Sequence, residues 1–108
     1  MGQAVLIVLD LPEAPLDAAA SFHRIHVPEA RRILSDAADI ESLIVRFSPV
    51  SREHLGWRLA AIQELAREAA PRRVNAIAVD ADTDIEGVLD FVASAPGVTG
   101  QLLAVGPA

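Results

Sequence analysis

Runs rich in β-branched residues and leucine occupy residues 4–9, 42–47 and 74–79. Apolar runs of this length are typical of strands that helices cover on both faces. Apolar positions recur at helical spacing over residues 28–38, 51–70 and 85–92, and residues 99–105 predict a last strand. Strands that alternate with helices of this length predict a parallel sheet with right-handed crossovers and helices on both faces.

The N-terminal part of the pattern is less regular. Residues 4–9 predict a strand in the centre of the sheet, ended by Asp10 and Pro12. Residues 12–20 contain two prolines and predict a short helical turn at most, and the loose alternation over residues 22–27 predicts a further, weak strand. The expected fold is α/β: a small three-layer Rossmann-like domain over residues 1–108, with a parallel sheet of about five strands.

The helix predicted over residues 51–70 has the clearest amphipathic pattern. Ser51 fits an N-cap, Glu53 lies in the first turn, and Pro71 marks the far end. The apolar face, expected to pack on the sheet, consists of Leu55, Leu59, Ile62, Leu65, Ala66 and Ala69. Trp57 and Ala61 fall on the opposite side, so the only tryptophan is expected to point away from the sheet, although a lone tryptophan can also lie against a neighbouring loop.

The composition narrows the classes of partner. Nine arginines, no lysine and a net charge of −6 leave no positive stripe for nucleic acid. The absence of cysteine excludes disulfides and thiolate chemistry and fits a cytoplasmic protein. The longest apolar run has no basic segment before it and is far shorter than the ~20 residues that cross a bilayer, so we expect neither a signal peptide nor a membrane span. The hydrophobic fraction of 52% favours burial of some surface against a second copy.

Two groups of residues have side chains that could bind a metal. His23 and His26 are three apart, which suits a metal only on a helix, and His54 is distant in sequence. Carboxylates that could hold a hard cation such as magnesium follow the strand over residues 74–79: Asp80, Asp82, Asp84 and Glu86. Acidic residues at a helix start are ordinary capping, however, so no metal site is expected.

A nucleophile with a neighbouring base is the remaining candidate for chemistry. Ser48, Ser51 and His54 lie close in sequence, but they lack the Gly-x-Ser-x-Gly turn that exposes a hydrolase serine, and they adjoin a predicted helix cap. The sequence therefore does not favour a hydrolase.

Four segments of the second half carry a family resemblance. They are Glu68-Ala69-Ala70-Pro71, Arg73-Val74-Asn75-Ala76-Ile77, residues 88–94 ending in Ser94, and residues 98–105 with the step Thr99-Gly100-Gln101. In this order they resemble the C-terminal part of the short-chain dehydrogenase/reductase family, where a long helix ends in Ala-Pro before an Arg-Val-Asn-Ala strand, a helix and a Thr-Gly-Gln strand. Residues 40–45 also look like the fourth strand of that family. The resemblance covers about half of the chain and implies a Rossmann-like fold.

The resemblance does not extend to the family's chemistry. The family uses a tyrosine as proton donor, assisted by a serine and by a lysine one helical turn after the tyrosine. Counting back from the Ala-Pro step places Ser51 and Leu55 near the tyrosine and lysine positions of the family, and the chain has no tyrosine and no lysine. The resemblance therefore implies a relative that is not an enzyme.

The family's cofactor motifs are also missing. The glycine-rich phosphate turn expected after residues 4–9 is replaced by a segment with three carboxylates, Asp10, Glu13 and Asp17. The family's Asn-Asn-Ala-Gly and Pro-Gly steps are replaced by Val45-Arg46-Phe47-Ser48 and Val79-Asp80. We therefore expect no cofactor.

Two functions stay open at this point. The first is a noncatalytic structural or interaction module, because in the related family the helix that matches residues 51–70 commonly packs against its copy in a partner subunit. It would form a homodimer or homotetramer, or bind a full-length dehydrogenase, through Trp57, Ala61, Glu64 and Glu68. The second is a small-ligand or nucleotide binder that uses the carboxyl edge of the sheet near Asp10, Ser48 and Asp80.

Overall fold

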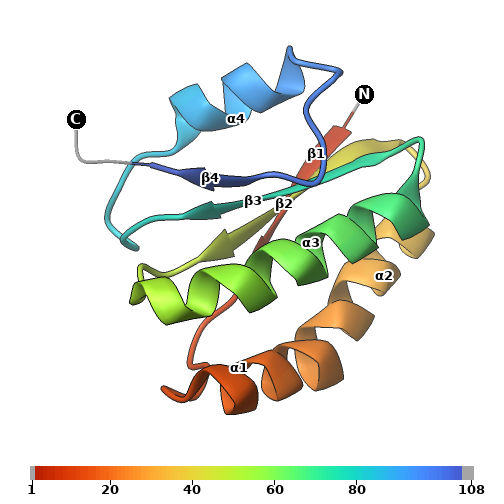
Figure 1. Ribbon diagram of the computed structural model, residues 1–108. Coiled ribbons are helices and arrows are strands. Elements are labelled where there is room, and N and C mark those ends of the chain that lie inside the picture. The colour runs from red at the N-terminus through yellow and green to blue at the C-terminus, as the bar shows by residue number, and fades with distance from the viewer. Residues whose placement is uncertain (1, 106–108) are drawn as a thin grey trace.

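The computed structural model describes residues 2–105, which form a four-stranded parallel sheet flanked by helices (Figure 1). Along the chain the elements are β1 (Gly2–Ile7), α1 (Pro15–Ser21), η1 (Phe22–His26), α2 (Val27–Asp36), β2 (Ile40–Phe47), η2 (Arg52–His54), α3 (Leu55–Ala69), β3 (Arg73–Ala78), α4 (Glu86–Ala93) and β4 (Leu102–Ala104). The predicted α/β class with a parallel sheet is confirmed. Residues 1 and 106–108 of the predicted domain lie outside the described residues.

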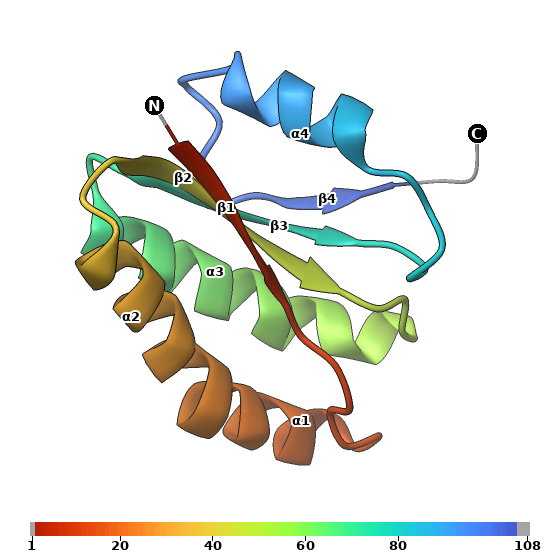
Figure 2. The same cartoon turned by 180° about the vertical axis from the view of Figure 1, so that it is seen from behind.

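Helices cover both faces of the sheet, so the domain has three layers. The segment α1–η1–α2 and α3 lie on one face, and α4 lies on the other (Figures 1 and 2). The larger core fills the first side, and a smaller core under α4 contains Ile44, Ile77, Val79 and Val92. Leu43 and Val45 of β2 face the larger core and Ile44 faces the smaller one, which explains why these three consecutive residues of β2 are all apolar.

The predicted central place of the first strand was wrong. The strand order is β1-β2-β3-β4, so β1 is an edge strand that pairs with β2 alone, and β2 and β3 are central. Leu6 and Val8 point into the larger core, whereas Val5, Ile7 and Leu9 are exposed on the face that α4 leaves uncovered (Figure 2). The apolar run was misleading because, among residues 2–105, no strand lies beyond β1, and on its second face α4 contacts the start of the strand, where Gln3 Nε2 donates to the Leu89 carbonyl at 3.3 Å, but leaves Val5 and Ile7 exposed.

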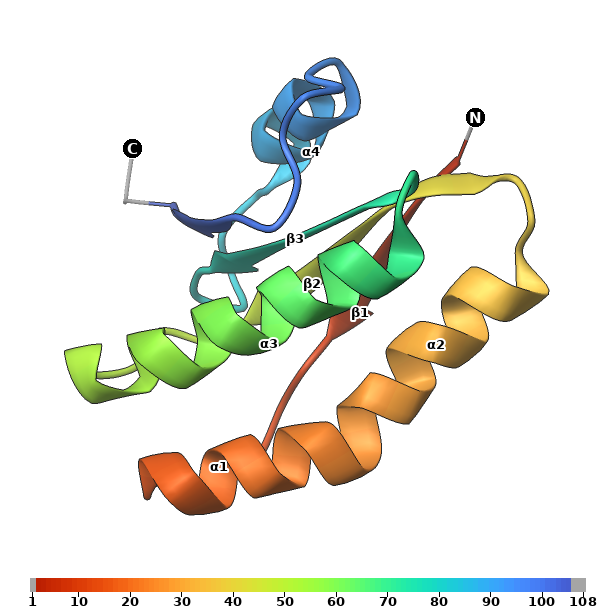
Figure 3. The same ribbon diagram turned by 45° about the vertical axis from the view of Figure 1, so that its right-hand side comes forward.

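The predicted strand over residues 22–27 was also wrong, and its absence leaves four strands. η1 is a single π-helical turn that joins α1 to α2, so residues 15–36 form one long helical arm (Figure 3). The Val27 N–H donates to the Phe22 carbonyl, five residues earlier, and both side chains are buried. The extra residue in this turn keeps five buried residues on the core side: Ala18, Phe22, Val27, Ala30 and Leu34. The step of five residues from Phe22 to Val27 fits neither the alternation of a strand nor the three- and four-residue steps of a regular helix.

The orientation of α3 differs from the helical-wheel prediction. Its buried residues are Arg58, Ala61, Ile62, Leu65 and Ala66, whereas Leu55 and Leu59 are exposed. Figure 3 shows the cause: α3 has the sheet on one side and the arm of α1 and α2 on another, so its buried sector is turned towards that arm. The prediction that Trp57 points away from the sheet was therefore wrong: its ring lies against Phe47 of β2, and Ala61 is buried.

The last part of the chain follows the sequence pattern closely. The Asp84 carboxylate accepts a hydrogen bond from the Glu86 N–H at 2.9 Å, which caps the start of α4, and Val92 faces the smaller core. β4 is shorter than predicted and pairs with β3 through Leu102, Leu103 and Ala104. Within residues 2–105, no helix has the length and apolar character needed to cross a membrane.

Candidate functional site

The carboxyl ends of β1, β2 and β3 meet at one edge of the sheet, where α/β proteins generally bind their ligands. A hollow of about 220 Å³ opens at this edge. Its lining residues are Ile7, Val8, Leu9, Arg46, Phe47, Ser48, Val79 and Ala81. The lining is mostly apolar and the volume lies below the roughly 300–1,000 Å³ of common ligand sites, so the hollow suits a small apolar group.

Arg46 is the charged residue in this lining, and its guanidinium already has protein partners. Its Nη2 donates to the backbone oxygens of Asp80 at 2.7 Å, Ala81 at 3.2 Å and Thr83 at 3.2 Å. These bonds hold the loop between β3 and α4 against the end of β2. Arg46 thus stabilises the loop at this edge of the sheet, and it also places a positive charge beside the hollow.

The three predicted ligand residues are only partly brought together. Ser48 lines the hollow, whereas Asp10 and Asp80 are exposed in the loops after β1 and β3 and do not line it. Asp10 has a φ of 59°, the left-handed backbone for which glycine is the usual choice. The turn after β1 therefore has a glycine-like backbone at Asp10 but adds a carboxylate, which disfavours a phosphate.

A buried arginine at the start of α3 is the feature that the sequence did not reveal. Arg58 is 2% exposed, its Nη1 donates to the Ser48 carbonyl at 2.9 Å, and its Cζ lies 4.2 Å from the centre of the Phe47 ring. Burial lowers the pKa of Arg58 to about 10, so the side chain stays charged at neutral pH. Its Nε has no hydrogen-bond partner among the described residues. Arg58 fixes the end of β2 to α3 through this contact with Ser48.

His54 joins the same region to the loop before α1. The Trp57 indole N–H donates to His54 Nδ1 at 3.0 Å. Because the indole can only donate, Nδ1 is the acceptor, and the proton on Nε2 is donated to the Glu13 carbonyl at 3.0 Å. The imidazole is buried and both of its nitrogens are occupied, so its role here is to connect elements.

The serines near His54 have other partners. Ser51 is exposed, and its hydroxyl donates to a Glu53 carboxylate oxygen at 3.0 Å instead of capping the helix with its side chain. Within residues 2–105 no hydrogen bond joins the hydroxyl of Ser48 or Ser51 to the His54 imidazole, and the His54 backbone N–H donates to the Ser51 carbonyl at 3.2 Å. Leu55 is exposed as well. Ser51 and Leu55, which the sequence places near the family's tyrosine and lysine positions, thus present a solvent-facing hydroxyl and a solvent-facing aliphatic chain.

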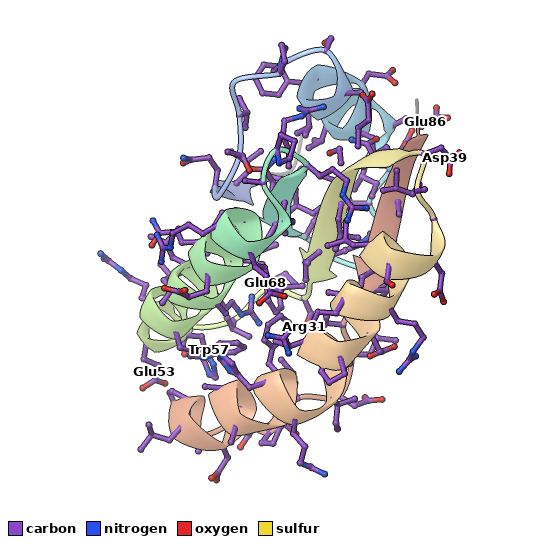
Figure 4. All side chains as sticks on the ribbon, turned by 90° about the vertical axis from the view of Figure 1, so that its right-hand side faces the viewer. Arg31, Asp39, Glu53, Trp57, Glu68 and Glu86 are labelled. Carbon is purple, nitrogen blue, oxygen red and sulfur yellow. The ribbon has the colours of Figure 1, made fainter. Side chains whose placement is uncertain are left out.

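The predicted interface residues on α3 divide into two pairs. Trp57 is partly buried and Ala61 is buried, and Figure 4 shows Trp57 between α3 and α1. The Trp57 ring centre lies 5.6 Å from Phe22 and 5.9 Å from Phe47, so Trp57 joins the arm, the sheet and α3. Trp57 and Ala61 therefore belong to the interior of the domain.

The other two predicted interface residues, Glu64 and Glu68, are exposed and form ion pairs. Glu64 pairs with Arg67 on the same helix, and Glu68 accepts two bonds from Arg31 of α2, at 2.7 and 2.9 Å (Figure 4). The hydrogen bond to Arg31 holds the pKa of Glu68 below its ordinary value, and the same bond raises the pKa of Arg31. An exposed pair of this kind contributes little to stability.

The family-like residues at the end of the chain form one hydrogen-bonded group. Asn75 is fully buried; its Nδ2 donates to the Val98 carbonyl at 2.9 Å, and its Oδ1 accepts from the Gln101 N–H at 3.0 Å. The Thr99 hydroxyl accepts from the Val74 N–H at 3.2 Å. Asn75 and Thr99 therefore fix the segment that leads into β4 against β3.

Two more family-like residues complete this group. Gly100 has a φ of 70°, and its N–H donates to the Val74 carbonyl at 2.8 Å. Arg73 Nη1 donates to the carbonyls of Val92 at 2.6 Å and Ala95 at 3.0 Å, which bind the end of α4 to β3. The Arg-Val-Asn-Ala and Thr-Gly-Gln motifs therefore hold β3, α4 and β4 together.

Of the candidate metal-binding histidines, His23 and His26 lie together on η1 and His54 lies on η2. His23 and His26 are on the helical arm, where His23 Nδ1 lies 2.8 Å from the Ala19 carbonyl and His26 Nδ1 lies 2.6 Å from a Glu29 carboxylate oxygen. Among residues 2–105, no three histidine or carboxylate side chains are arranged to hold a metal ion.

Comparison with known proteins gives one match. The family model described as "Short chain dehydrogenase-like protein" matches residues 6–105, which is nearly the whole chain. Neither the curated proteins nor the solved structures contain a significant match. The parallel sheet, the Asn75 and Gly100 group and the family match agree, and the chain belongs to the short-chain dehydrogenase-like family.

Proposed function

We propose that this protein is a noncatalytic member of its family that acts as a self-associating interaction module. The observation that carries the proposal is the difference between the residues that match the family and those that do not. The matching residues Arg73, Asn75, Thr99 and Gly100 build the β3–α4–β4 scaffold. Ser51 and Leu55, near the tyrosine and lysine positions of the family, supply neither an acid of suitable pKa nor a charge to tune one.

The edge of the sheet supports the noncatalytic part of this proposal. The segment after β1 carries Asp10, Glu13 and Asp17, and Asp10 occupies the one left-handed backbone position there. A pyrophosphate binds where backbone N–H groups and glycines allow close approach, and negative side chains oppose it. The protein therefore lacks both the tyrosine that would donate a proton and a segment that would bind the pyrophosphate of a dinucleotide.

Self-association is supported by the apolar surface. Val5, Ile7, Leu9 and Phe91 are large apolar side chains that remain exposed, and the first three form a row along one strand and its extension. Trp57 and Ala61 support the fold, so the assembly, whether a homodimer, a homotetramer or a complex with a full-length dehydrogenase, uses another surface. The cytoplasmic location expected from the lack of cysteine stays a prediction.

Two measurements test this function. Purified protein should not oxidise NADH or NADPH with a panel of aldehydes and ketones, and steady turnover that copurifies with the protein would contradict the noncatalytic assignment. Light scattering over a tenfold concentration range should give a mass of at least two chains. A mass of one chain throughout would contradict self-association and leave the noncatalytic assignment standing.

The hollow at the carboxyl edge favours one second candidate, a binder of a small apolar ligand. Leu9, Phe47 and Val79 provide apolar contacts in its lining, and Arg46 and Ser48 are the lining residues that could bind a polar group of the ligand. A thermal-shift screen with dinucleotides, mononucleotides, divalent cations and small apolar acids tests it, because a ligand that binds the native state raises the melting temperature. Leu9→Trp should fill the hollow and abolish any shift, whereas Leu16→Trp on α1 should leave it unchanged.

A further inference from the structure

The free edge of β1 exposes unpaired backbone groups. The Val8 N–H donates to the Arg46 carbonyl at 2.9 Å, so Val8 points its backbone groups towards β2. Backbone groups alternate along a strand, and Leu6 and Ala4 therefore also face β2. The N–H and C=O groups of Val5 and Ile7 point the other way, where no strand lies within residues 2–105. Such an edge is a template for a further strand.

The same residues expose their side chains. Val5 is 36% exposed, Ile7 56% and Leu9 57%, whereas Leu6 and Val8 are buried in the larger core. On that side α4 lies over β2, β3 and β4 and reaches the start of β1, where Gln3 Nε2 donates to the Leu89 carbonyl at 3.3 Å (Figure 2). The backbone and side chains of Val5 and Ile7 are thus both available to the same partner.

The β1 sequence contains no charged residue and no proline, although the pairing of β1 with β2 is irregular between Gly2 and Gln3 at the start of the strand. Natural edge strands commonly carry charged residues or proline, which hinder pairing with another chain. Residues 2–9 contain neither, and Asp10 is the first charged residue. Although the chain carries a net charge of −6, two copies can align their β1 strands without placing carboxylates of these strands opposite each other. A second β1 strand is therefore an apolar and uncharged partner for the first.

We propose that β1 pairs with β1 of a second copy in antiparallel orientation, which joins two four-stranded sheets into one continuous sheet. A closed dimer has a two-fold axis, and an axis perpendicular to the sheet makes the two equivalent strands antiparallel. The outward-facing residues then lie opposite one another, so Val5 and Ile7 of each copy meet on the same face of the sheet. The inference rests on the self-association proposed above and names its surface.

Val5→Pro tests the backbone part of this interface. Proline removes the outward N–H of residue 5 and leaves the bonds between β1 and β2 intact, because edge strands tolerate proline where the N–H faces solvent. Val5→Ala is the matched control, since it shortens the side chain and keeps the N–H. Light scattering should show a mass of two chains for the native protein and for Val5→Ala, and half that mass for Val5→Pro.

Ile7→Lys tests the side-chain part, because it places two like charges beside each other in the paired strands. Leu16→Lys is its control: it makes the same charge change at a residue that is 87% exposed on α1. Ile7→Lys should halve the mass and Leu16→Lys should leave it unchanged. Circular dichroism of each variant shows whether the fold is retained.

The outcomes separate this proposal from the proposed function. A native mass of one chain at all concentrations overturns both. If the native protein is a dimer and both Val5→Pro and Ile7→Lys remain dimers, the β1 interface is overturned but self-association is not. If Ile7→Lys becomes a monomer and folded Val5→Pro remains a dimer, pairing of the strands is overturned. Hydrogen exchange of the native protein needs no variant: the amides of Val5 and Ile7 should be protected and lose protection on dilution, and fast exchange at every concentration overturns the proposal.

Discussion

Trp57→Ala should remove a large part of the folding free energy. The indole packs against Phe22 and Phe47, with ring centres 5.6 and 5.9 Å away, and donates to the buried His54. Truncation of a fully buried tryptophan costs about 3–5 kcal/mol, and because Trp57 is only partly buried we expect about 2–4 kcal/mol. This value includes the two aromatic contacts, at about 0.5–1.5 kcal/mol each, and the His54 nitrogen left without a donor.

Urea unfolding followed by far-ultraviolet circular dichroism measures this loss. Fluorescence is unsuitable because Trp57 is the only tryptophan and the chain has no tyrosine. A domain of this size has a total stability of about 5–15 kcal/mol, and each kcal/mol lost lowers the melting temperature by about 4–8 °C. Leu59→Ala, at an exposed position of the same helix, is the control and should cost less than about 1 kcal/mol.

The opposite result would refute this reasoning. If Trp57→Ala and Trp57→Arg left the urea midpoint unchanged and lowered the mass of an assembly, Trp57 would lie on an outer surface, as the helical-wheel pattern suggested. Trp57→Phe separates the two contributions: it keeps most of the ring packing and removes the hydrogen bond to His54, so it should cost about 1–3 kcal/mol.

Three further substitutions test the scaffold. Asn75→Leu leaves the Val98 carbonyl and a backbone N–H unpaired in a buried site and should lower the unfolding free energy by about 2–4 kcal/mol in urea, and a loss below 1 kcal/mol would contradict its role. Gly100→Ala, at a φ of 70°, should cost about 1–2 kcal/mol, and a neutral result would exclude the left-handed backbone there. Arg58 has a pKa of about 10 in the folded state and a higher one when unfolded, so above pH 10 the unfolded state binds more protons and stability should rise with pH, by about 1 kcal/mol at pH 11. No lysine, tyrosine or cysteine titrates in this window, so Arg58→Met should lose the rise, and a flat profile for the native protein would contradict the cost of burying the charge.

The sequence by itself determined the family and, outside residues 12–27, the local elements. Runs rich in β-branched residues and leucine identified β2 and β3, the Asp84 cap identified α4, and the Asn75 and Gly100 motifs indicated the short-chain dehydrogenase-like family. These signals depend on residues close in the chain, or on side chains such as Asn75 whose partners lie in the segment that leads into β4. The composition alone also showed that the family's tyrosine and lysine are absent.

Tertiary structure alone decided which surface each element buries. Periodicity shows that one side of a helix is apolar, but α3 packs against both the sheet and the helical arm, and this turned Trp57 inwards and buried the Arg58 charge. The π turn at Phe22 brings residues five apart into one core, a spacing that sequence patterns do not mark. The place of β1 at the edge depends on which strands lie beside it, and no property of the β1 residues themselves encodes that neighbour.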